Sequence, residues 1–71
     1  MVTAPDRPSR TKYPFAVLAD CAQREVKMRR RVYPNRILTG RMSHAFADAE
    51  IDKMEAIAQV LVEMVAKEKL L

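Results

Sequence analysis

The stretch between Pro34 and Gly40 constrains the fold of this chain most, because Gly40 is its only glycine and the rest of the sequence suits helices. Pro34 lacks an N–H group and disfavours helical backbone at Tyr33, so a first helix is expected to end at Val32. Gly40 can adopt the left-handed conformation that often follows a helix end. The stretch therefore predicts two helices, joined by a short linker with one or two helical turns between Pro34 and Thr39.

The first helix is expected to begin at Pro14, since proline is well tolerated in a first helical turn. Its apolar residues fall on one broad face at helical spacing; they are Val17, Leu18, Cys21, Ala22, Met28 and Val32, extended on one side by Phe15, Ala19 and Val26. Cys21 is interpreted as a small buried hydrophobic residue. Two charged residues, Glu25 and Arg29, lie inside this apolar arc, four positions apart.

The second helix is expected from His44 to Lys69, with Ser43 as its N-cap. The centre of its apolar face is formed by Ala47, Ile51, Met54, Ala58, Leu61 and Val65, and the flanks by Phe46, Ile57, Val60, Val62 and Met64. Together they span an arc of roughly 200°, more than one partner helix can cover. The excess predicts self-association as a homodimer through Ile57, Val60, Leu61, Met64 and Val65.

A chain of 71 residues forms one small domain with a thin core. Residues 1–12 are expected to be a flexible tail, and residues 13–71 a single all-α domain built as a hairpin of two antiparallel helices. One cysteine and one histidine exclude an intrachain disulfide and a four-ligand zinc site, so no cofactor is expected. No apolar run suggests a signal peptide or a membrane span, and a cytoplasmic location is expected by default.

The charges are unevenly divided along the chain. Residues 1–41 carry ten Lys or Arg and three acids, whereas residues 42–71 carry three Lys and six acids. The basic cluster comprises Arg24, Lys27, Arg30, Arg31, Arg36 and Arg41. One interpretation is a solvated helix face, with the two oppositely charged halves attracting each other. The other is weak contact with the phosphates of a nucleic acid, without base reading.

Glu25 and Arg29, together with Glu50 inside the apolar arc of the second helix, are the more unusual constellation. The structural interpretation is a partly buried charge network crossing the hairpin or a dimer interface, which can fix register at little net gain in stability. A catalytic role would require a pocket and a carboxyl group of raised pKa. A pocket is not expected in so small a helical protein, and the chain is predicted not to be an enzyme.

Four short segments occur in a distinctive order: EVKMRRRVYP at residues 25–34, GRM at 40–42, ADAEI at 47–51 and MEAI at 54–57. In their order and spacing, these segments resemble a group of small uncharacterised proteins from bacteriophages and prophages. The resemblance covers residues 25–57, under half of the chain, and implies a phage or prophage origin and a bacterial host cytoplasm. It implies no activity and no site residue, because no activity is associated with that group.

Together these features predict a non-enzymatic phage accessory protein that acts by binding another macromolecule, most simply a host or phage protein. The alternative is a nucleic-acid-associated protein that uses the basic face of the first helix.

Overall fold

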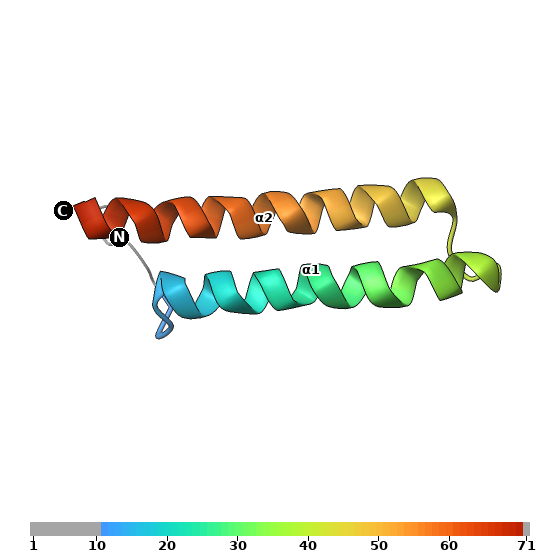
Figure 1. Cartoon of the computed structure of the whole chain (residues 1–71), viewed down its shortest axis with the longest axis horizontal. Helices are drawn as coiled ribbons and strands as arrows, with labels where there is room; N and C mark the ends of the chain where they lie inside the picture. Colours follow the sequence, from blue (N-terminus) through green and yellow to red (C-terminus); the bar gives the residue numbers. More distant parts are fainter. Residues whose placement is uncertain (1–10, 71) are drawn as a thin grey trace, which may run out of the picture.

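Two antiparallel α-helices make up the architecture of the computed structural model, which describes residues 11–70 (Figure 1). Helix α1 spans Phe15–Leu38 and helix α2 spans His44–Leu70, and they lie side by side along nearly their full length. No strand occurs among residues 11–70. The predicted all-α helical hairpin is therefore confirmed. The predicted tail, residues 1–12, lies outside the described residues except for Thr11 and Lys12.

Helix α1 does not end before Pro34, and this prediction from the sequence is wrong. The helix continues through Pro34 to Leu38, so the turns expected as a separate linker are the last turns of α1. Pro34 and Arg30 are both exposed, so water can hydrate the Arg30 carbonyl that receives no hydrogen bond from proline. The missing hydrogen bond is thus on the solvent side, where its loss is least costly.

Gly40 ends α1 as the sequence predicted. Its φ is +78°, in the left-handed region. The N–H of Gly40 donates to the carbonyl of Ile37 at 3.1 Å, and the N–H of Arg41 donates to that of Arg36 at 2.8 Å. This pair of bonds satisfies carbonyls that a helix end otherwise leaves without partners. The chain then reverses within residues 39–43.

Ser43 caps the start of α2, also as predicted. Its Oγ accepts a hydrogen bond at 3.1 Å from the N–H of Phe46, three residues later in the chain. The cap satisfies one of the four N–H groups that lack partners in the first turn. Lys67 and Lys69 lie in the last turn of α2, where the helix dipole favours positive charge.

The core between the helices is thin and consists mainly of alanine. The buried hydrophobic residues are Phe15, Ala19, Ala22, Val26, Ala47 and Ala58. Met54 and Leu61 pack against the central cluster of Ala22, Val26 and Ala58. Small side chains let the helices approach closely, but each buries less apolar area than a Leu or Phe would. The hairpin therefore gains little from its internal core.

The buried face of α1 is rotated from the predicted one. Cys21, expected to be buried, is exposed, and Val17 is 49% exposed. The apolar arc predicted for α1 is wide, and its periodicity does not indicate which part of the arc faces α2. The small residues Ala19 and Ala22 lie at that contact because they permit the closest approach of the two backbones, and the larger residues are left at one side.

Candidate interaction surfaces

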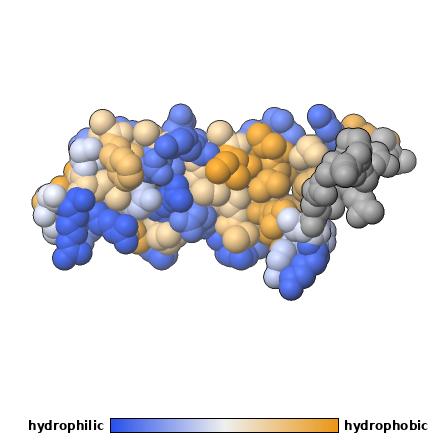
Figure 2. All heavy atoms as spheres, turned by 180° about the vertical axis from the view of Figure 1, so that it is seen from behind, coloured by the Kyte–Doolittle hydropathy of each residue, from blue (hydrophilic) through white to orange (hydrophobic). Residues whose placement is uncertain are grey.

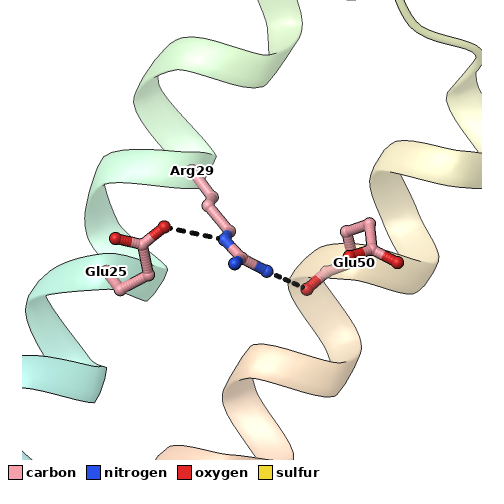
Figure 3. Close-up of polar contacts among 3 residues, drawn as sticks. All are labelled: Glu25, Arg29 and Glu50. Carbon is pink, nitrogen blue, oxygen red and sulfur yellow. Dashed lines mark hydrogen bonds and ion pairs between the residues drawn. The ribbon is translucent and has the colours of Figure 1, made fainter.

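Arg29 links the two helices through a polar network on one side of the hairpin (Figure 3). Its Nε donates to Oε2 of Glu25 at 2.9 Å, and its Nη1 donates to the backbone carbonyl of Glu50 at 2.8 Å. The carboxylate of Glu50 pairs instead with Lys53. We refer to these four residues as the Arg29 network. The three residues singled out in the sequence are thus brought together, within one chain.

The Arg29 side chain is only 21% exposed, so its charge needs the partners that surround it. The hydrogen bond to Glu25 raises the pKa of Arg29 above its ordinary value and outweighs the opposite effect of burial. The network thus favours the charged form of Arg29. The network contains two acids and two bases, so its net charge is zero.

Large hydrophobic side chains remain exposed on the same side of the hairpin. On α2, Phe46, Ile57 and Val60 are each exposed by half or more. They recur at spacings that keep them on the edge of α2 that carries Glu50 and Lys53. On α1, Val17 and Cys21 occupy the matching edge with Glu25.

We call this surface the apolar face. It comprises Val17, Leu18, Cys21, Met28 and Val32 of α1 and Phe46, Ile57, Val60 and Met64 of α2. Figure 2 shows a hydrophobic area beside a hydrophilic band on one side of the molecule. Two residues predicted for self-association do not belong to it: Leu61 packs against the core cluster, and Val65 is half-buried beside a groove. Ile57, Val60 and Met64 do belong to it.

The basic cluster is divided by ion pairs within the chain. Arg24 pairs with Asp20 one turn earlier, and Arg30 pairs with Glu55 across the hairpin. The guanidinium of Arg36 lies 5.7 Å from the ring centre of Tyr33, in the range of a cation–π contact.

Arg36 forms no ion pair among residues 11–70, and neither do the exposed cations Lys27, Arg31 and Arg41 of the cluster. The cross-helix pair of Arg30 and Glu55 supports the interpretation that the two halves attract each other. It also leaves fewer cations available to phosphates.

An open groove of about 700 Å³ runs between the helices on the side away from the Arg29 network. Its floor includes Val26 and Ala58, and its rims carry Lys27 and Arg30 on α1 and Asp52 on α2. Among residues 11–70, no group of three His, Cys, Asp or Glu side chains is placed to hold a metal ion. The same residues contain no helix that is long and apolar enough to cross a membrane.

Sequence reasoning missed two participants in these surfaces, Lys53 and Glu55. Lys53 lies three residues after Glu50, a spacing that places the two on one helix edge. Glu55 could not be matched with Arg30 from the sequence, because that pair depends on the register between the two helices.

No protein-family model, curated protein or solved structure matches this chain. The fold and the surfaces described above are therefore the basis for the function proposed below.

Proposed function

We propose that this chain is a non-enzymatic accessory protein of a phage or prophage, which acts in the bacterial cytoplasm by binding another protein through its apolar face. One observation carries the proposal: Val17, Phe46, Ile57 and Val60 are all about half exposed or more on one side of a very small molecule. Exposed apolar side chains gathered on one side of a protein, among charged residues, are typical of protein–protein interfaces. The phage setting rests on the sequence resemblance alone.

Affinity capture from a bacterial host lysate tests the proposal. The tagged protein is compared with Val60→Glu, which places a charge in the apolar face, and with Gln59→Glu. Gln59 is also exposed but lines the groove on the other side of the hairpin. We expect a captured protein, identified by mass spectrometry and bound again after purification, to be lost with Val60→Glu and retained with Gln59→Glu. Equal capture by both variants would contradict the proposal.

Nucleic-acid association is the second candidate, favoured by the exposed Lys27, Arg31 and Arg41, which form no ion pair among the described residues. Lys27 and Arg31 lie on α1, and Arg41 lies in the turn that follows it. Binding driven by phosphates is sequence-independent and weakens steeply with salt, whereas binding through an apolar face does not. A salt titration therefore separates the two candidates.

A further inference from the structure

The apolar face and the Arg29 network lie on the same side of the hairpin, so a partner that covers one of them also covers the other. This inference rests on the proposed function and concerns what covers that same surface until another protein binds to it. A partner must bury the exposed side chains of Val17, Ile57 and Val60 and also accommodate four charged residues. A surface that repeats the same pattern meets both conditions, because the network is neutral and can lie against a second neutral network without a net charge clash.

The dimensions of the face fit a second copy. Helix α1 has 24 residues and is about 36 Å long at 1.5 Å per residue. Two adjacent helices of about 10 Å width present roughly 700 Å² on one side. Stable protein complexes bury about 800 Å² per partner. Pairing two hairpins by this face thus gives an interface of ordinary size for a stable dimer.

Charge decides how the two copies are oriented. Helix α1 carries six Lys or Arg and two acids, a net charge of +4. Helix α2 carries three Lys and six acids, a net charge of −3. Two hairpins can pair face to face in two ways. A two-fold axis perpendicular to the helices sets α1 against α1 of the partner, whereas a two-fold axis parallel to the helices sets α1 against α2 of the partner. The parallel axis places opposite charges together and avoids pairing two helices of charge +4.

We propose that a second copy of this chain covers the apolar face, with a two-fold axis along the hairpin, so that α1 of each copy lies across α2 of the other. The product is an antiparallel four-helix bundle. The two Arg29 networks meet at one level of its interface and fix the register, a role known for polar residues at helix interfaces. The grooves lined by Lys27 and Asp52 remain on the outside of the dimer, accessible to further partners.

The register identifies residues that should meet across the dimer. Ala22 packs in one cluster with Ala58 and Leu61, so its neighbour Cys21 lies level with Val60 along the hairpin. Rotation about an axis along the hairpin keeps that level and exchanges the helices. Cys21 of one copy is therefore set across from the partner's Val60, whereas the two Cys21 residues are on different sides of the bundle. Both positions are exposed in the single hairpin.

Light scattering or sedimentation of the unmodified protein at micromolar concentration is the first test, with a dimer expected. A monomer would overturn the proposal without the need for any variant. If capture by the monomer still depended on Val60, the proposed function would stand and only the second copy would be rejected. A dimer that captures no other protein would support the second copy and reject the proposed function.

Disulfide cross-linking tests the orientation. Under mild oxidation with copper phenanthroline, Val60→Cys is expected to yield a covalent dimer on a non-reducing gel, through Cys21 of one copy and the new cysteine of the other. The wild type and the double variant Cys21→Ser, Val60→Cys should yield several-fold less. Gln59→Cys is the matched control, since Gln59 is also exposed but lines the groove.

Circular dichroism should first show that the variants remain helical. Efficient linkage of the wild type through Cys21 alone would indicate α1 against α1 and overturn the proposed orientation. Linkage of Gln59→Cys equal to that of Val60→Cys would overturn the interface itself.

Discussion

At the residue scale, Gly40 and Arg29 each have a conformation or a set of hydrogen bonds that other residue types cannot easily reproduce. Gly40 has a φ of +78°, and a Cβ built there would meet no atom within 4 Å. The requirement for glycine is therefore a matter of backbone conformation and not of space. Arg29 joins both helices through two hydrogen bonds, to Glu25 and to the backbone of Glu50. Each position yields a prediction with an internal control.

Gly40→Val should lower the free energy of unfolding by roughly 1 kcal/mol or more, because a β-branched residue resists the left-handed conformation. Gly40→Asn should cost less, since asparagine tolerates that conformation better and no atom lies within 4 Å of a Cβ at this position. Urea denaturation followed by circular dichroism measures both. A Gly40→Val protein as stable as the wild type would mean that the turn tolerates a different backbone conformation.

Arg29→Gln should lower the free energy of unfolding by about 1 kcal/mol, because Glu25 and the Glu50 carbonyl lose a charged donor at a half-buried site. The estimate is kept low because the Glu25 side chain is more than a third exposed and is screened by water. The control is Arg24→Gln, whose exposed ion pair with Asp20 should contribute less than about 0.5 kcal/mol. If both variants lowered the free energy of unfolding equally, the Arg29 network would stabilise the hairpin no more than an exposed ion pair does.

At the element scale, the hairpin shows which local signals determine structure and which yield to tertiary contacts. Gly40 and Ser43 carry local chemistry that acts within a few residues, and both behave as predicted. Pro34 also carries a local signal, yet α1 passes through it. Because the helix continues, Tyr33 and Ile37 lie in half-buried positions. The helix then ends just before Gly40, where the chain reverses its direction.

The same contrast separates the surface residues that were predictable from those that were not. Glu25 and Arg29 were recognisable because charges inside an apolar arc require partners. The exposure of Cys21 and the pairing of Arg30 with Glu55 depend on the rotation of α1 about its axis and on the register between the helices. Neither quantity is encoded in the periodicity of a single helix, since an arc wider than the contact can be docked at several rotations.

Pro34→Ala should stabilise α1 and raise the free energy of unfolding by roughly 1–2 kcal/mol. Alanine supplies the N–H that the Arg30 carbonyl lacks and removes the steric cost of a proline ring inside a helix. Greater freedom of the unfolded chain offsets part of this gain. Thermal unfolding of the variant is the measurement. A lower melting temperature for Pro34→Ala would show that the proline positions the last turns of α1.

At the scale of the whole molecule, the core of residues 11–70 contains one phenylalanine, one valine and four alanines, and so it buries little apolar area. Domains of this size usually require additional support from a metal, a disulfide or a partner. In the proposed dimer, the apolar face provides the additional burial, and the uneven charge of α1 and α2 limits the orientations in which a second copy can approach.

Binding to DNA should be weak, independent of sequence and strongly dependent on salt. Arg24 and Arg30 are engaged by Asp20 and Glu55, which leaves about four cations for phosphates, namely Lys27, Arg31, Arg36 and Arg41. Four phosphate contacts give a slope of about −3 to −4 in a plot of log affinity against log salt concentration. Fluorescence anisotropy with labelled duplexes of different sequence measures it. Tight, sequence-selective binding at about 150 mM salt would favour the nucleic-acid candidate instead.

The turn closed by Gly40 and Ser43 also has a kinetic consequence. Because only residues 39–43 separate the helices, contacts near the turn join residues close in sequence, and the hairpin can form progressively from that end. Helical proteins with such local contacts fold in microseconds to milliseconds. Association of two copies is a second-order event and takes milliseconds to minutes, depending on concentration. When the concentration of newly made chains is low, the rate at which two chains meet would therefore determine how long each remains a single hairpin with an uncovered apolar face.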